Sequence, residues 1–299
     1  MNRNITLTLF AVLVFAPCGL STDLGEVVPD LTTPTMTTDA PGPGKRVRMT
    51  LANYEGTDVH HALYLPSDWT KGKKYPLIVE YAGNGPYRNK NGDTCSGKVE
   101  DCNLGYGISG GKGVIWLCLP YISQDHKNNQ LKWWGDVDAT VDYCKQAVRK
   151  VCADYGGDSA NVYIAGFSRG AIACNYIGLH DDEIASLWRG FICHSHYDGV
   201  RQWAYTGSDK KSAAARLRRL GNRPQFISHE TSVDATRAYL KHVFPTGNFT
   251  FQALSLHNHT DTWVLRDIPE RKAVRAWFNQ VLKQPVQQGT ADDATHRAP

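Results

Sequence analysis

Short apolar runs alternate with segments of helical periodicity through the middle of the chain. The apolar runs predict strands at residues 75–81, 114–119, 161–165, 190–193, 225–228 and 249–256. Apolar spacings of three and four predict helices over residues 136–155, 169–180, 234–243 and 270–282. Residues 46–52 and 60–66 alternate in polarity like the two arms of a hairpin. The pattern predicts an α/β fold: a mostly parallel central sheet with an antiparallel edge, covered by helices on both faces.

The two ends of the chain differ from this core. Residues 1–21 combine an early basic residue, an apolar run and small residues, which predicts a secretory signal peptide; an uncleaved membrane anchor is the alternative. Residues 22–44 are rich in Thr, Pro, Asp and Gly and predict a disordered linker, and residues 284–299 predict a disordered tail. Residues 45–283 then form one folded domain. We expect secretion without stable membrane insertion, since no later segment is apolar enough to span a bilayer.

Composition narrows the class of protein. Hydrophobic residues make up 41% of the 299 positions and charged residues 21%, which is the balance of a globular protein. The net charge of +4 is small and the basic residues are scattered, which argues against nucleic acid as the main partner. Of the eight cysteines, seven remain once Cys18 is removed with the signal peptide. Export favours disulfides, and Cys95 and Cys102, which bracket a short loop, are the best local pair.

A candidate nucleophile lies between a predicted strand and a predicted helix. The pentapeptide Gly166-Phe167-Ser168-Arg169-Gly170 is a Gly-x-Ser-x-Gly motif. It follows the strand 161–165 and opens the helix 169–180, which is the setting of a nucleophile elbow. In such a turn Ser168 is presented at the carboxyl edge of the sheet, beside a helix N-terminus that favours negative charge.

With this motif in this position, residues 45–283 resemble the α/β-hydrolase superfamily. In general character the chain is similar to secreted serine esterases of the polyhydroxybutyrate-depolymerase and feruloyl-esterase type. The resemblance implies the chain order serine, acid, histidine and a small-molecule or carbohydrate ester as substrate. No metal or organic cofactor is needed for that chemistry.

The resemblance places the histidine in the loop between the last strand and the last helix. His257 and His259 both lie there. We favour His259, because the residues before it align with the approach to the histidine in the family, and His257 remains the alternative.

The acid is expected just beyond the penultimate strand, 225–228. Glu230 lies in the following loop and is free to reach a histidine. Asp234 is expected at the N-terminus of the next helix, where an acidic cap is common. Glu230 is therefore the preferred acid, with Asp198 and Asp234 as alternatives.

The oxyanion hole is expected to combine two backbone sources. One is the N–H of Arg169, the residue after the nucleophile. The other is the loop after strand 75–81, where the small residues at Gly83 and its neighbour Asn84 stand in the place of the family's His-Gly-Gly.

Two other interpretations compete with the serine mechanism. The segment His194-Ser195-His196-Tyr197-Asp198 has the His-x-His-x-Asp spacing of a metal-dependent hydrolase. The chain could also be an exported, non-catalytic binding protein that keeps the fold. Four tryptophans in or near predicted loops could line a groove for a sugar or aryl ester: Trp133, Trp134, Trp203 and Trp263. The expectation we favour is a secreted carboxylesterase-like serine hydrolase that uses Ser168, Glu230 and His259.

Overall fold

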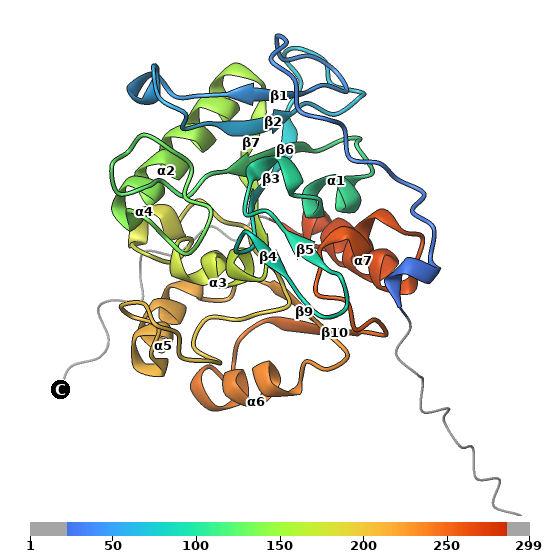
Figure 1. Cartoon of the computed structure of the whole chain (residues 1–299), viewed down its shortest axis with the longest axis vertical. Helices are drawn as coiled ribbons and strands as arrows, with labels where there is room; N and C mark the ends of the chain where they lie inside the picture. The colour runs from blue at the N-terminus through green and yellow to red at the C-terminus, as the bar shows by residue number, and fades with distance from the viewer. Residues whose placement is uncertain (1–22, 286–299) are drawn as a thin grey trace, which may run out of the picture.

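A computed structural model describes residues 23–285 of the chain (Figure 1). The predicted signal peptide and all but the first two residues of the predicted tail lie outside the described residues. Within the described part, no helix is both long enough and apolar enough to cross a membrane.

The described chain folds into strands and helices in the alternation that the sequence predicts. The strands are β1 (Arg46–Met49), β2 (His61–Tyr64), β3 (Tyr75–Tyr81), β4 (Tyr87–Arg88), β5 (Thr94–Cys95), β6 (Ile115–Leu119), β7 (Gly157–Phe167), β8 (Gly190–His194), β9 (Gln225–Glu230) and β10 (Phe249–Leu254). The helices are α1 (Leu104–Ser109), α2 (Val137–Asp154), α3 (Arg169–Tyr176), α4 (Asp182–Ala185), α5 (Lys210–Leu217), α6 (Asp234–Val243) and α7 (Pro269–Lys283). Short 3₁₀ helices span Leu24–Glu26, Ala52–Tyr54, Val99–Asp101, Arg218–Leu220 and Thr262–Leu265.

Eight strands form one sheet in the order β1-β2-β6-β3-β7-β8-β9-β10. The pairs β1–β2 and β2–β6 are antiparallel, and every later pair in this sheet is parallel. The predicted α/β class and the antiparallel edge are therefore confirmed. Because β3, β7, β8, β9 and β10 are parallel, the loops that follow them open at one edge, which is where a doubly wound sheet places its functional residues.

Helices cover both faces of the sheet and bury a separate apolar core against each (Figure 1). Helices α2 and α3 contribute Val141, Val148 and Ile172 to one core. Helices α1 and α7 contribute Ile108 and Phe278 to the other. The central strands are thus buried on both faces, which explains their nearly continuous apolar sequences.

Helix α1 was not predicted, because its stabilisation comes from a distant strand. The Glu80 carboxylate, buried within β3, accepts hydrogen bonds from the backbone N–H groups of Asn103, Leu104 and Gly105. It also accepts the indole N–H of Trp116 at 2.8 Å. A carboxylate at a helix N-terminus satisfies backbone donors that have no partner within the helix, so the Gly-containing segment is stabilised by tertiary contact.

Residues 23–44 differ from the expected disordered linker. They run along the surface of the domain from α7 toward β1, and Leu24 is buried. The Asp30 carboxylate accepts hydrogen bonds from the Arg271 guanidinium at 2.7 and 2.8 Å. The backbone N–H groups of Asp30 and Leu31 donate to the Leu265 carbonyl. A polar segment such as this one cannot form a hydrophobic core of its own. It can still be ordered by packing against the surface of the folded domain.

The predicted Cys95–Cys102 disulfide is not formed in the structure. All seven cysteines within the described residues are free thiols. Cys102 is buried and its thiol interacts with that of Cys118 on β6, whereas Cys95 lies on the β4–β5 hairpin next to Gly83. The prediction chose Cys95 because it is close to Cys102 along the chain. In the fold, β6 instead brings the Cys118 thiol next to Cys102.

Candidate active site

Ser168 lies in a strained turn between β7 and α3. Its backbone has φ 54° and ψ −114°, a left-handed conformation that is unfavourable for a residue with a side chain. The two flanking glycines permit the turn. A Cβ on Gly166 would lie 2.2 Å from the Gly170 carbonyl, and a Cβ on Gly170 would lie 1.9 Å from the Tyr81 carbonyl oxygen. The sequence therefore forms the sharp strand–turn–helix geometry that the motif predicts.

His259 lies beside this serine. The Ser168 hydroxyl donates to His259 Nε2 at 3.1 Å. The His259 Nδ1–H donates to Glu230 Oε1 at 2.8 Å. The structure thus joins Ser168, His259 and Glu230 in one chain of hydrogen bonds, with the tautomer of His259 set by its bond to the carboxylate.

Ser195 completes this network and was not identified from the sequence. Its hydroxyl lies 2.7 and 2.9 Å from the two Glu230 oxygens and 2.8 Å from His259 Nδ1. Ser195 is 3% exposed and has φ 81°, so its backbone is strained as well. Its single hydroxyl proton can go to Glu230 while its oxygen shares the proton on His259 Nδ1. Ser195 therefore orients both members of the pair.

Burial alone would raise the pKa of Glu230. The hydrogen bonds from His259 and Ser195, together with the nearby histidines, outweigh that effect and hold this pKa well below its usual range. Glu230 is therefore a carboxylate at neutral pH, in the state that can stabilise a positive charge on His259.

The loop that carries His259 is anchored by a residue on the β4–β5 hairpin. Asp93 Oδ2 accepts the backbone N–H of His259, and Asp93 Oδ1 accepts the side-chain amide of Asn258, both at 2.9 Å. Asn258 in turn accepts the backbone N–H of Leu24 at 2.7 Å. The position of His259 thus depends on two segments that lie far from it in sequence.

The alternative histidine and acids lie elsewhere. His257 Nε2 is 3.6 Å from Asp23 Oδ2. Asp198 is buried and receives two hydrogen bonds from the Arg216 guanidinium. Asp234 begins α6, where its exposed carboxylate lies 3.5 Å from Arg237.

The His-x-His-x-Asp segment does not assemble a metal site. His194 Nδ1 contacts the Ser228 hydroxyl and its Nε2 contacts the Thr260 carbonyl. His196 Nδ1 donates to the Ser195 carbonyl, and Asp198 pairs with Arg216. The segment leaves the strand after His194, so the alternation on which the metal interpretation depended ends there. Among residues 23–285, no group of three or more metal-ligating side chains could hold an ion.

The Arg169 side chain reaches behind the loop that follows β3. It is 1% exposed, and its guanidinium lies 3.9 Å from the centre of the Tyr121 ring. It donates to the carbonyls of Gly83 at 2.8 Å, Trp133 at 2.6 Å and Ala82 at 3.4 Å. One side chain therefore ties the turn after Ser168 to the loop where the sequence predicts oxyanion donors.

These carbonyl contacts set the direction of the predicted donors. In a trans peptide the C=O and the following N–H point in opposite directions. The Ala82 carbonyl faces Arg169 and also accepts the Tyr121 hydroxyl at 3.1 Å, so the Gly83 N–H points away from them. The Gly83 carbonyl also faces Arg169, so the Asn84 N–H points away as well. Both donors therefore face the side of the loop opposite the guanidinium.

Aromatic side chains surround His259. The rings of Phe167, His196 and Tyr87 lie 4.8, 5.4 and 5.5 Å from its ring centre. Trp203 stacks on His196 with an interplanar angle of 21°, and Trp133 lies 5.3 Å from Trp203. Of the other two tryptophans named from the sequence, Trp134 and Trp263 are buried and contribute to packing.

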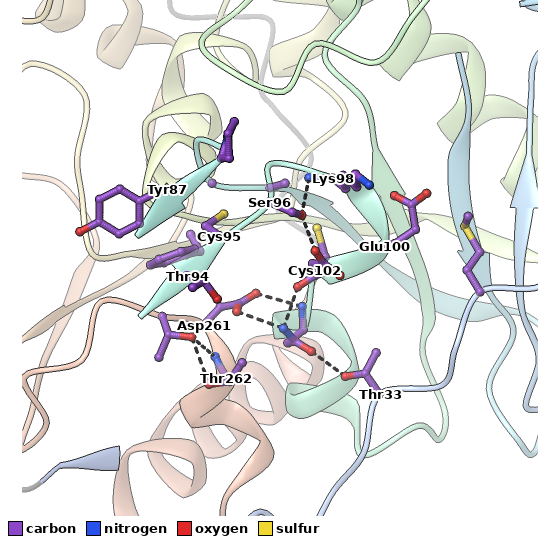
Figure 2. Close-up of a pocket in the computed structure, with 18 of the residues that line it drawn as sticks. Thr33, Tyr87, Thr94, Cys95, Ser96, Lys98, Glu100, Cys102, Asp261 and Thr262 are labelled. Carbon is purple, nitrogen blue, oxygen red and sulfur yellow. Dashed lines mark hydrogen bonds between the residues drawn. The ribbon is translucent and has the colours of Figure 1, made fainter. Parts of the chain in front are cut away.

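A cavity of about 810 Å³ adjoins the site (Figure 2). It lies between the β4–β5 hairpin, residues 33–36 and the loop after His259, and Gly83 and Phe167 form part of its wall. Asp261 is among the lining residues, and burial, together with the nearby Glu80, raises the pKa of this carboxyl above its usual range.

The chain is similar to known proteins in structure but not detectably in sequence. No model of a known protein family matches the sequence, and no curated protein is significantly similar to it. Solved structures do match. Esterase 2 of Thermogutta terrifontis, in a form phosphorylated by paraoxon, is similar with a TM-score of 0.54 and 15% identity over 80% of this chain and 94% of that one.

Two further esterases have a similar fold. One of two fungal esterases from Rhizomucor miehei matches with a TM-score of 0.51 and 12% identity, over 80% of this chain and 82% of that one. A thermostable esterase matches with a TM-score of 0.51 and 15% identity, over 79% of this chain. This chain spans only 62% of the length of that esterase. These likenesses, with the sheet order and the strained turn at Ser168, show an α/β-hydrolase fold.

Proposed function

We propose that this protein is a serine hydrolase that cleaves carboxylic esters. The hydrogen-bonded series Ser168–His259–Glu230 carries the proposal, because it places a hydroxyl, a base and a carboxylate in the order that nucleophilic catalysis requires. The strained backbone of Ser168 and the low pKa of Glu230 support the same roles.

In the proposed reaction, the Ser168 oxygen attacks the ester carbonyl while His259 Nε2 takes its proton. The resulting imidazolium is stabilised by Glu230 and returns the proton to the oxygen of the leaving alcohol as the carbon–oxygen bond breaks. Water then attacks the acyl-enzyme with His259 again acting as base, which releases the acid and restores Ser168.

The negative oxygen of the tetrahedral intermediate is proposed to accept hydrogen bonds from backbone N–H groups of Arg169 and of Gly83 or Asn84. The Arg169 side chain acts here as a positioning group, because it holds the carbonyls of Ala82 and Gly83 on the opposite side of the loop.

Replacing Arg169 with methionine should lower kcat by about 10²-fold with little change in KM. The loop that offers Gly83 and Asn84 would lose its fixed orientation, and loss of an oxyanion donor affects the transition state far more than the bound ester. Steady-state kinetics on phenyl acetate, with thermal unfolding measured in parallel, test this. Arg169→Lys should recover part of kcat. A folded Arg169→Met protein with normal kcat would contradict the positioning role.

The substrate class is also part of the proposal. An aromatic surface beside His259 and the adjoining cavity support an ester of a small molecule or a carbohydrate, in keeping with the resemblance to feruloyl-esterase-type enzymes. The apolar start of the sequence supports secretion to the cell exterior.

Covalent labelling by a fluorophosphonate is the direct test of the serine mechanism. The folded protein should be labelled with 1:1 stoichiometry, and peptide mapping should place the label on Ser168. Ser168→Ala should remove the labelling, whereas Ser232→Ala, in an exposed turn, should not. A folded protein that takes up no label, or takes it up equally after Ser168→Ala, would refute the proposal.

A further inference from the structure

An exposed cation, Arg201, lies at the end of a series of ring contacts that begins at His259. The Arg201 guanidinium lies 4.2 Å above the centre of the Trp203 ring. Trp203 stacks on His196 at 5.5 Å, and His196 lies 5.4 Å from the ring of His259. These contacts form a continuous series from the proposed base to an exposed charge.

The proposed reaction says where the alcohol part of an ester must lie. His259 Nε2 must return a proton to the leaving oxygen, so the alcohol begins its departure next to that ring. The oxyanion loop at Gly83 holds the carbonyl oxygen instead. We assign the groups that continue outward from the His259 ring through His196 and Trp203 to the alcohol side, because they adjoin the ring that returns the proton.

Arg201 has unused hydrogen-bonding capacity. It is exposed, and none of the residues within 23–285 forms an ion pair with it or accepts a hydrogen bond from it. Arg216 differs, because it donates hydrogen bonds to the Asp198 carboxylate and to the Gly207 carbonyl. Trp203 covers one face of the Arg201 guanidinium, which leaves the N–H edge available. That edge matches the two oxygens of a planar carboxylate.

The loop that presents Arg201 is fixed before any substrate binds. At its two ends the Arg216 guanidinium joins the Asp198 carboxylate to the Gly207 carbonyl. Within it, the Ser208 hydroxyl donates to the Trp203 carbonyl at 2.6 Å and accepts the Trp203 N–H at 3.2 Å. A side chain held in this way loses less conformational entropy on binding than a free surface arginine does.

On the basis of the proposed ester hydrolysis, we propose that Arg201, stacked on Trp203, binds a carboxylate carried by the alcohol part of the substrate. The preferred substrates are then esters of hydroxy acids or of acidic sugars. Trp203 is a positioning residue for Arg201, because its own faces are covered by His196 and by the guanidinium.

The test compares two acetate esters of similar shape, 3-carboxyphenyl acetate and 3-carbamoylphenyl acetate, at low ionic strength. The ratio of their kcat/KM values is measured for the wild type and for Arg201→Gln. Taking the ratio within one protein cancels any general loss of activity. Comparing the ratios of the two proteins cancels the intrinsic difference between the two leaving groups. We expect the ratio to fall about fivefold in Arg201→Gln, the order of an exposed ion pair. In the wild type, high salt should lower it similarly.

Arg218→Gln is the matched control, since Arg218 is an exposed arginine on the 3₁₀ helix Arg218–Leu220, and its ratio should equal that of the wild type. An unchanged ratio in Arg201→Gln, with phenyl acetate still hydrolysed by the wild type, would overturn the carboxylate site alone. If the wild type hydrolyses no acetate ester and resists fluorophosphonate, the proposed function itself fails, and this site with it.

Discussion

Replacing His259 with alanine should lower kcat on the order of 10⁶-fold. The members of a serine–histidine pair act as a unit, so losing the base costs about as much as losing the nucleophile. His259 Nε2 accepts the Ser168 hydroxyl at 3.1 Å, and in the described residues no other histidine makes that contact. Single-turnover and steady-state kinetics with an activated acetate ester would measure the loss.

The matched control is His257→Ala, which changes the other histidine of the same loop. Its kcat should stay within a few-fold of the wild type, because its ring lies near Asp23 rather than Ser168. If His257→Ala were inactive and His259→Ala active, the assignment of the base would be wrong by two residues.

Replacing Glu230 with glutamine should lower kcat on the order of 10⁴-fold while leaving KM nearly unchanged. A neutral amide cannot stabilise the imidazolium, and its N–H₂ can favour the wrong tautomer of His259. The Ser195 oxygen lies 2.8 Å from His259 Nδ1 and can still accept a hydrogen bond from its N–H. Adding Ser195→Ala to Glu230→Gln should therefore reduce activity further. Steady-state kinetics of Glu230→Gln, Ser195→Ala and the double variant measure that coupling.

Asp234→Asn is the control for this acid, because Asp234 was an alternative in the sequence and its carboxylate is exposed on α6. Its kinetics should match those of the wild type. Near-normal turnover of Glu230→Gln would show that the acid lies elsewhere.

The sequence contained strong local signals for the parts of the site that a short segment determines. The turn at Ser168 requires close backbone approaches at Gly166 and Gly170, and those glycines are visible in the motif. The order of strands placed the end of β9 and the loop after β10 at the same edge, which is why Glu230 and His259 could be named together, although Glu230 is the last residue of β9 and not part of the following loop. Helix α6 begins and ends where its periodicity predicts.

Other parts of the site depend on contacts between distant residues and have no local signal. Ser195 was considered only as a spacer between two histidines, yet the break in the strand after His194 turns its hydroxyl to Glu230. Asp93 lies in a hairpin of two-residue strands that has too few residues to show periodicity. The motif predicts a role for the backbone N–H of Arg169. The role of its side chain has no local signal, because it depends on carbonyls from two other loops, those of Ala82, Gly83 and Trp133.

The docked segment from residue 23 to residue 44 has a practical consequence for how this protein is produced. Composition suggests trimming the chain to begin at Lys45, as is common for expression of a catalytic domain. That boundary would remove Leu24, whose N–H binds Asn258 next to His259, and Asp30, which neutralises the nearly buried Arg271. The shortened protein would expose apolar surface on α7 and lose support for its histidine loop. Poor yield or weak activity of such a protein would then reflect where it was cut rather than the chemistry of its active site.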